Sequence, residues 1–352
     1  MQLRFKDGLC RRLFFLLVAG TLLLPNANAV SCKTGSQMTA AERDALSSTA
    51  RTLAGDVQSG DTQALRNNTL PAVAADFGGI AASANNLKPL MQQATITVEE
   101  LYLLDASDQS AGAARTDFYC GTRIVTIDIP NLPSGKYALA ILHATGVPQP
   151  QQLSLILSEN AENRWMLAGF FSNRMIEAGH DGLWYWQQAR EYAQKKMDWN
   201  AWFYYQTAAA LLQPAPFLSS PNFEKLQQEA DRARPANLPA ATRPVMLDVQ
   251  GSPVELTTIN ITEAFGGFDL EVHYIPSTAQ LAQLHDPVAA RKQAIAIMTA
   301  LLVQHPELRS GFRGVWVRAD QNGGSIYALD LPMAQIASTT PTPAATSNPA
   351  TR

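Results

Sequence analysis

Apolar residues repeat at helical spacing at the start of the region 36–176 and at strand spacing later in it. Four of them, separated by four, three and four positions, share one face of a helix: Leu46, Ala50, Leu53 and Val57. Thr39 and Glu42 have the spacing of a capping box at the start of that helix. Five segments rich in Val, Ile, Leu and aromatic residues follow, which we expect to be strands: 94–106, 118–130, 135–146, 151–160 and 164–172. This order predicts an α+β domain in which a curved antiparallel sheet wraps a leading helix.

A second region, residues 179–234, returns to helical spacing and alternates tyrosine with alanine. Six residues form the expected seam between two antiparallel helices: Tyr185, Ala189, Tyr192, Ala201, Tyr205 and Ala208. Small residues between large ones allow two helices to approach closely and interlock. Asp181 is suited to cap the first helix of this pair, and a third helix is predicted over 220–233.

A second, smaller α+β unit is predicted over 245–336, beyond a proline-rich linker at 235–244. Its expected strands cover 245–249, 254–261, 268–276, 311–320 and 325–332, and a helix begins at Asp286-Pro287. The unit is therefore expected to be a sandwich of one sheet and one helix layer. Residues 337–352 are dense in Thr, Pro, Ala and Ser, which cannot bury enough apolar surface to order a segment. We predict a disordered tail there.

The element order of the region 36–176, helices followed by long antiparallel strands, resembles the nuclear-transport-factor-2-like (cystatin-like cone) folds. The resemblance is one of pattern, without a diagnostic motif. It implies a cone that holds a small ligand or an acid–base pair, or else a module with a packed interior. The alternating residues expected to face inward are mostly aliphatic, and His143 is the one histidine among them.

The tyrosine–alanine seam resembles a single tetratricopeptide repeat. In the 34-residue frame that starts at Gly182, the seam residues fall at the aromatic and small positions of that repeat. Two departures are Gln188, which replaces the usual leucine, and Pro214, which comes one residue late. Because no second copy follows at that period, the resemblance implies one helical hairpin and not an array.

Residues 1–29 have the pattern of a bacterial export signal. Four basic residues precede or border the apolar run 13–24, and Ala27-Asn28-Ala29 supplies small residues at the cleavage positions. The apolar run is too short to span a bilayer, and no later run approaches that length.

Loss of residues 1–29 removes four basic residues and one acidic residue, so the net charge falls from −3 to −6. We expect a periplasmic or extracellular protein and, without a basic stripe, no nucleic-acid partner.

Two cysteines remain after cleavage, Cys32 and Cys120, because Cys10 leaves with the signal. An even pair in an exported chain predicts a disulfide that ties the mature N-terminus to a strand. The alternative is lipidation of Cys32, since Ala29-Val30-Ser31-Cys32 partly resembles a bacterial lipobox. In that case Cys32 would anchor the protein to the membrane.

Four of the six tryptophans lie within residues 181–205. The candidate binding residues in this stretch are Trp184, Trp186, Trp199, Trp202 and Tyr204. Tryptophan and tyrosine are enriched in binding hot spots, which favours a ligand groove or a partner surface. The competing interpretation is a core between domains, because a single helical hairpin cannot bury its own faces. On that interpretation the aromatic residues cover the third helix or a neighbouring domain.

The sequence contains none of the common catalytic, nucleotide-binding or metal-binding motifs. Asp269, Glu271 and His273 alternate along one strand and so share one of its faces. Such a face could bind a divalent cation but is more typical of a solvated surface. His143 is expected to be a core or rim histidine. We therefore predict no catalytic residue, no metal and no cofactor.

Two functional hypotheses follow from these patterns. The first is an exported, non-catalytic scaffold or binding protein of a bacterial cell envelope, whose aromatic hairpin contacts an envelope protein. The second is a cone-type hydrolase or isomerase with a small-molecule pocket in the first domain. A polar cavity with a carboxylate within hydrogen-bond reach of His143 would favour the enzyme. A filled apolar interior would favour the binding protein, which is the hypothesis we adopt.

Overall fold

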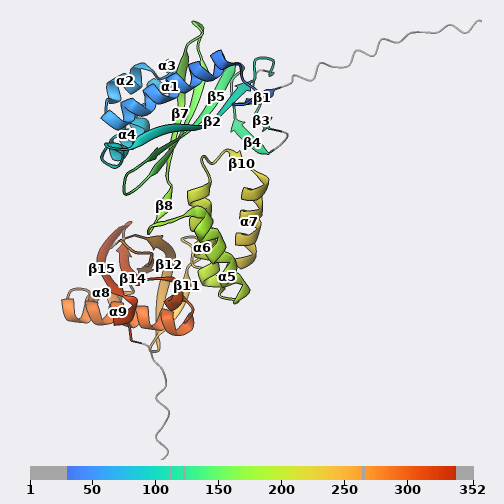
Figure 1. Cartoon of the computed structure of the whole chain (residues 1–352). Helices are drawn as coiled ribbons and strands as arrows, with labels where there is room; N and C mark the ends of the chain where they lie inside the picture. The colour runs from blue at the N-terminus through green and yellow to red at the C-terminus, as the bar shows by residue number, and fades with distance from the viewer. Residues whose placement is uncertain (1–29, 111, 122–123, 264–265, 338–352) are drawn as a thin grey trace, which may run out of the picture.

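The computed structural model describes residues 30–110, 112–121, 124–263 and 266–337. The predicted export signal and the predicted tail from residue 338 onward lie outside the described residues. The described chain is a mixed α+β structure with an N-terminal and a C-terminal body, which meet beside α6 (Asp198–Leu212) and β8 (Ile176–Glu177) (Figure 1). None of the helices in these ranges is both long enough and apolar enough to cross a membrane.

The N-terminal body is a sheet with helices on one face. Its helices are α1 (Ala40–Ser59), α2 (Thr62–Asn67), α3 (Pro71–Ala74) and α4 (Gly78–Met91). Its main sheet has the order β1-β2-β5-β6-β7, formed by β1 (Ser31–Thr34), β2 (Thr95–Asp105), β5 (Lys136–Thr145), β6 (Gln151–Glu159) and β7 (Trp165–Arg174). All neighbours in this sheet pair antiparallel, as the strand pattern predicted. Figure 1 shows α1 lying along the sheet.

Alternate residues of the main sheet build one core on each of its faces. Leu53 of α1 packs with Leu142 and Leu155 on the helix-facing side, where all three side chains are buried. Phe118 and Ile141 belong to a second core on the opposite side. Aliphatic side chains therefore fill the space between α1 and the sheet. Whether this body belongs with the cone folds remains a prediction.

The predicted capping box at the start of α1 is confirmed. The backbone N–H of Glu42 donates to Thr39 Oγ1 at 3.2 Å, and the backbone N–H of Thr39 donates to Glu42 Oε2 at 2.7 Å. These two bonds satisfy backbone donors that the first turn of a helix leaves open. Asp181 and Asp286 likewise cap the helices that follow them.

The prediction of one continuous strand over 118–130 is wrong. The structure has two strands there, β3 (Arg115–Cys120) and β4 (Val125–Pro130), paired antiparallel as a hairpin. Gly121, directly after β3, has a φ of 55°, a left-handed conformation that glycine adopts without strain. The hairpin leaves the main sheet and pairs with β10 (Leu218–Ser219) in a sheet of its own.

The C-terminal body combines the helical segment with the second sheet. Its helices are α5 (Gly182–Gln194), α6 (Asp198–Leu212), α7 (Pro221–Ala233), α8 (Thr278–Gln283), α9 (Pro287–Gln304), α10 (Leu308–Gly311) and the 3₁₀ helix η1 (Met333–Gln335). Its sheet runs in the order β11-β12-β13-β14-β15, with β11 (Val245–Val249), β12 (Ser252–Thr262), β13 (Asp269–Ile275), β14 (Gly314–Gln321) and β15 (Gly324–Pro332). β13 and β14 are parallel, and α8, α9 and α10 lie between them in the chain. One hydrophobic core joins α5, α6 and α7 to this sheet and to α9.

The seam predicted between α5 and α6 is present. Tyr185, Ala189, Ala201, Tyr205 and Ala208 are buried, whereas Tyr192 is partly buried. At the start of α5, a Cβ on Gly182 would lie 2.5 Å from the side chain of Leu212 at the end of α6. The two helices are therefore antiparallel and closely packed. The likeness to a tetratricopeptide repeat remains a prediction.

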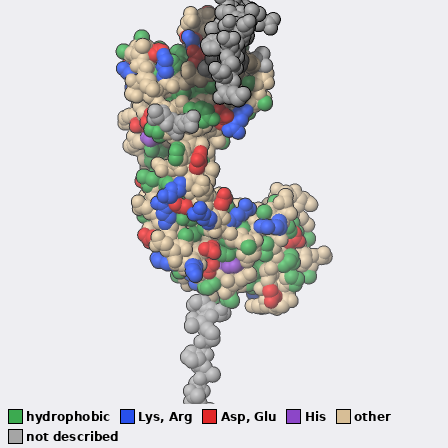
Figure 2. All heavy atoms as spheres, turned by 90° about the vertical axis from the view of Figure 1, so that its right-hand side faces the viewer, with side chains coloured by type: hydrophobic (Ala, Val, Ile, Leu, Met, Phe, Trp, Pro, Cys, Tyr) green, Lys and Arg blue, Asp and Glu red, His purple; other side chains and the backbone are tan. Residues whose placement is uncertain are grey.

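The two bodies are joined through the segment after α6. Ser154 Oγ donates to the Pro214 carbonyl at 2.9 Å, and the ring of Phe217 lies edge-on to Phe171 at 5.2 Å. β10 continues this contact by pairing with β4. The chain passes from β7 to α5 through a short antiparallel hairpin, which is formed by β8 (Ile176–Glu177) and β9 (His180–Asp181). Figure 2 shows the outline of the molecule indented between the two bodies.

Candidate functional site

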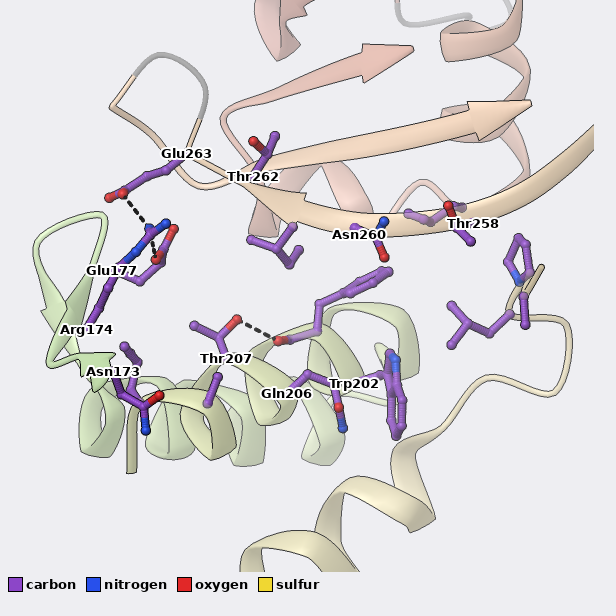
Figure 3. A pocket seen from close by; sticks show the side chains of 18 of the residues that line it. Asn173, Arg174, Glu177, Trp202, Gln206, Thr207, Thr258, Asn260, Thr262 and Glu263 are labelled. Carbon is purple, nitrogen blue, oxygen red and sulfur yellow. Dashed lines mark hydrogen bonds and ion pairs between the residues drawn. The ribbon is translucent and has the colours of Figure 1, made fainter. Parts of the chain in front are cut away.

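A groove of about 860 Å³ lies between α6 and β12 (Figure 3). Residues of α6 from Trp202 to Leu211 form one wall, and residues 258–263 form the other. The segment Leu238 to Ala241, which belongs to the predicted linker, closes one end. The ends of β7 and β8 close the other end. The groove is thus built by both bodies.

The groove meets β12 along the edge of that strand. Six consecutive residues, Thr258 to Glu263, line it. Side chains of a strand alternate between the two faces of a sheet, so a groove over one face would touch only every second residue. An unbroken run of lining residues indicates that the groove faces the backbone edge.

This edge of β12 has no strand partner among the described residues. β11 pairs with β12 only from Ser252 to Leu256. The residues from Thr258 to Thr262 pair with β13 on their other side. The chain that enters β11 turns away just before it, through a backbone-bonded turn from Ala240 to Arg243.

The end of the groove beside the N-terminal body is acidic. Arg174 Nη1 lies 2.8 Å from Glu177 Oε2 and 3.2 Å from Glu263 Oε2. Glu263 also accepts a hydrogen bond from the backbone N–H of Ala178. Burial, together with the nearby charge of Glu263, raises the pKa of Glu177. Two carboxylates therefore share one arginine, and the end of the groove favours a further cation.

The wall formed by α6 offers neutral groups. Gln206 is exposed, and Trp202 is partly buried with the guanidinium of Arg234 5.4 Å from its ring centre. Figure 3 shows Trp202 and Gln206 across the groove from Thr258 and Asn260. Amide and hydroxyl side chains donate and accept hydrogen bonds and are neutral, so this wall does not select a ligand by its charge.

Two of the five candidate binding residues are buried in the core. Trp199 is 5% exposed and packs against His305, with ring centres 4.2 Å apart. Tyr204 is 6% exposed, and its hydroxyl donates to the Gly311 carbonyl at 2.7 Å. Both side chains join α6 to the end of α9 and to α10.

Two further candidates, Trp184 and Trp186, are partly buried outside the groove. Trp184 stacks on His180 with ring centres 3.7 Å apart. Trp186 Nε1 donates to Glu229 on α7 at 2.7 Å, and Arg190 both stacks on Trp186 and pairs with Glu229. Trp202 is the candidate that the structure places in the groove. Its neighbours Gln206, Thr258 and Asn260 were not identified from the sequence.

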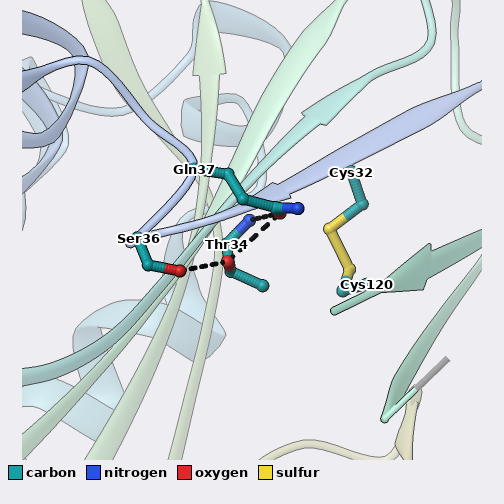
Figure 4. Close-up of a disulfide and its surroundings, with 5 residues drawn as sticks. All are labelled: Cys32, Thr34, Ser36, Gln37 and Cys120. Atoms are coloured by element: carbon teal, nitrogen blue, oxygen red, sulfur yellow. Dashed lines mark hydrogen bonds between the residues drawn. A yellow bond between two sulfur atoms is a disulfide. The ribbon is translucent and has the colours of Figure 1, made fainter. Parts of the chain in front are cut away.

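Cys32 and Cys120 form a disulfide that joins β1 to the end of β3 (Figure 4). Their Cα atoms lie 5.2 Å apart, within the range of disulfides. A sulfur in this bond cannot carry the thioether of a lipid. Of the two sequence alternatives for Cys32, the structure therefore supports the disulfide.

His143 was expected to face inward, toward the helices, and this expectation is wrong. It lies on the opposite face of the main sheet, because its neighbours Leu142 and Ala144 occupy the helix-facing core. Its Nε2 is 3.2 Å from Gln152 Oε1, and its Nδ1 is 3.9 Å from the carboxylate of Glu99, beyond hydrogen-bond distance.

A smaller pocket of about 390 Å³ opens between the start of α1 and the edge of the main sheet. Its charged groups include Lys33 and Glu42, paired at 3.0 Å, and Lys136 and Glu159, paired at 3.5 Å. Glu42 is also held by its capping bonds to Thr39. The carboxylates named here are therefore engaged by lysines or by the helix cap.

The polar face predicted for residues 269–273 is not a simple solvated surface. Asp269 is buried, and burial raises the pKa of its carboxyl group. Glu271 forms an ion pair with Arg318 of the neighbouring strand. His273 Nδ1 lies 2.6 Å from Asp320 Oδ2. Pairing across strands explains the difference, and within the described residues no cluster of three or more His, Cys, Asp or Glu could hold a metal ion.

Comparison with known proteins yields no relative for this chain. No family model, no curated protein and no solved structure matches it. The two resemblances drawn from sequence pattern therefore stay predictions, and a functional assignment has to rest on the geometry of the groove.

Proposed function

We propose that the chain is an exported, non-catalytic binding protein of a bacterial cell envelope, and that the groove between α6 and β12 is its binding site. The observation that carries the proposal is the open edge of β12 inside a groove of about 860 Å³. An open strand edge is a ready template for binding. The groove surrounds it with neutral hydrogen-bonding groups and with the partly buried ring of Trp202.

The cysteine pair supports the export part of the proposal. Structural disulfides persist in oxidising compartments such as the periplasm and are rare in the cytosol. Cys32 lies only three residues after the predicted cleavage position and is already part of the fold through β1. A chain that starts at Val30 would retain this strand and its disulfide.

The N-terminal body supports the binding protein over the hydrolase or isomerase. Its helix-facing side is filled by aliphatic side chains, and His143 lies on the other face. The pocket of about 390 Å³ is the observation that favours an enzyme, yet Glu42 and Glu159 there are paired with lysines. The packed interior is what the binding hypothesis expects.

Site-specific photo-crosslinking in the native host tests the proposal. Ala210 is exposed and lines the groove, so a photoreactive phenylalanine derivative at this position would face a bound partner. Ala282 is an exposed alanine of another helix, α8, that does not line the groove, and it is the matched control. We expect a discrete crosslinked adduct from position 210 and none from position 282. Equal adducts from both positions, or none from either, would refute the proposed site.

A further inference from the structure

We propose that the groove binds an extended polypeptide segment of a partner protein, which adds as a strand to β12 beside Thr258 to Thr262. This inference rests on the proposed function and names the chemistry of its ligand. Strand addition to an open sheet edge gives affinity through main-chain hydrogen bonds and specificity through the alternating side chains.

The existing sheet fixes where the added strand would lie. β11 already occupies the same edge of β12 from Ser252 to Leu256 and then stops. The residue before β11 is Pro244, which has no backbone N–H and cannot extend the ladder. A ligand strand would continue the line of β11 along the next five residues of β12, a length of about 17 Å.

The shape of the groove selects a single strand over a second sheet. α6 stands opposite the edge of β12 and forms the other wall of the groove. The same edge of a second copy of this chain lies within its own groove, behind its own α6. Two copies therefore cannot bring these edges together, whereas a flexible segment can enter.

The charge at the end of the groove formed by β7 and β8 predicts one feature of the ligand sequence. Glu177 and Glu263 share Arg174 as their one ion-pair partner among the described residues. Burial and mutual repulsion raise the pKa of Glu177, and a nearby cation would relieve both effects. A segment with Lys or Arg at the end that reaches these carboxylates is favoured over an acidic one.

The first test is selection of peptides on the intact mature chain with its disulfide formed. The probe is a phage-displayed library of random peptides of about eight residues, enough to cover the open edge. We expect selected peptides to be rich in β-branched residues and to carry Lys or Arg near one end. Ala210→Trp would fill the groove and weaken their binding by about tenfold or more, whereas Ala282→Trp would change it by less than about twofold. Circular dichroism of both variants checks that they fold.

The second test separates strand addition from side-chain binding. Two versions of one selected peptide are made, each N-methylated at alternate residues. A strand in a ladder turns alternate N–H groups toward its partner, so one version loses binding and the other keeps it. Equal behaviour of both versions would overturn strand addition.

The outcomes distinguish this inference from the proposed function. Failure to select any peptide, or selected peptides that bind Ala210→Trp as well as the unchanged chain, would overturn the inference. If position 210 still crosslinks to an envelope component, the groove is a binding site for another kind of ligand, such as a small molecule. If position 210 gives no adduct either, the proposed function fails as well.

Discussion

Trp199 and Trp202 lie three residues apart on α6 and have different surroundings. Trp199 is 5% exposed and packs against His305 in the core that joins α6 to the C-terminal sheet. Burial lowers the pKa of His305, so its neutral form is favoured against this ring. Trp202 is partly buried and lines the groove. We therefore propose the assignment of stability to Trp199 and of ligand contact to Trp202.

Replacement of each tryptophan by alanine tests this assignment. Trp199→Ala removes a large side chain from a packed core and should lower the free energy of unfolding by about 3–5 kcal/mol. Trp202→Ala should lower it by clearly less, because part of that side chain already contacts solvent. Urea denaturation measures both. The assignment would be wrong if the Trp202 variant were as destabilised as the Trp199 variant.

Ala201 tests the packing of the seam between α5 and α6. It is fully buried between the two helices, so Ala201→Leu forces extra volume into the seam and should cost about 1–3 kcal/mol of stability. Ala210→Leu is the same change at an exposed position of the same helix and should stay within about 0.5 kcal/mol. Thermal unfolding of the two variants provides the comparison. Equal melting temperatures would mean that Ala201 is not in a tight seam.

The elements could be predicted from the sequence wherever local chemistry decides them. Thr39, Asp181 and Asp286 cap helices because their side chains bond backbone N–H groups within the next three residues, and such spacing is visible in the sequence. The seam of α5 and α6 follows from the spacing of its tyrosines and alanines. Most strands could also be predicted, because their Val, Ile, Leu and aromatic residues are concentrated in short segments of the sequence.

Pairing between distant strands could not be predicted in this way. Gly121 inside a strand-like run gave the one local signal for the β3–β4 hairpin, yet the departure of this hairpin from the main sheet depends on β10, far along the chain. The parallel pairing of β13 with β14 likewise depends on packing of the intervening helices. The face of His143 could not be predicted because β5 is buried on both faces for most of its length, so no alternation of polar and apolar residues marks its inner face.

The sequence contains one weak indication of the open edge in the groove. The segment 254–261 reads as a strand of eight residues, and its predicted hairpin partner 245–249 has only five. That mismatch leaves part of one edge without a partner in the hairpin, and Pro244 prevents the shorter strand from growing. The wall formed by α6 is a tertiary feature, which no local pattern indicates.

The start of α1 gives a pH prediction. A hydrogen bond from the Thr39 backbone, with further ones from Lys33 and the Thr39 hydroxyl, lowers the pKa of Glu42 from 4.5 to about 2. Because the pKa is lower in the folded state, this stabilisation is present above pH 4.5 and is lost as the pH falls toward 2. The melting temperature of Glu42→Gln should therefore lie below that of the unchanged chain at pH 6, and the gap should narrow as the pH falls through this window. A gap that stays constant with pH would contradict this role of Glu42.

At the scale of the whole molecule, the chain consists of two bodies with separate cores. The disulfide lies entirely in the N-terminal body, where it links β1 to the β3–β4 hairpin across 88 positions of sequence. The C-terminal body holds five of the six tryptophans, since Trp165 is the one in the N-terminal body. Tryptophan fluorescence therefore reports mainly on the C-terminal body.

Loss of the disulfide should affect the two bodies unequally. Cys32→Ser with Cys120→Ser should lower the stability of the N-terminal body by about 2–5 kcal/mol, as for other native disulfides. Calorimetry should show the transition of that body at a lower temperature, while the transition followed by tryptophan fluorescence moves little. If both transitions shifted together, the two bodies would unfold as one unit.

The open edge of β12 is the feature on which the proposed function depends, and amide hydrogen exchange of the free protein, resolved residue by residue by NMR, measures it most directly. Residues of a strand with one partner donate alternately to that partner and to solvent. From Thr258 to Thr262 we therefore predict slow and fast exchange in alternation, whereas Glu255 and Leu256, which have β11 on one side and β13 on the other, exchange slowly. Uniformly slow exchange from Thr258 to Thr262 would show that the edge is already covered and would contradict the account.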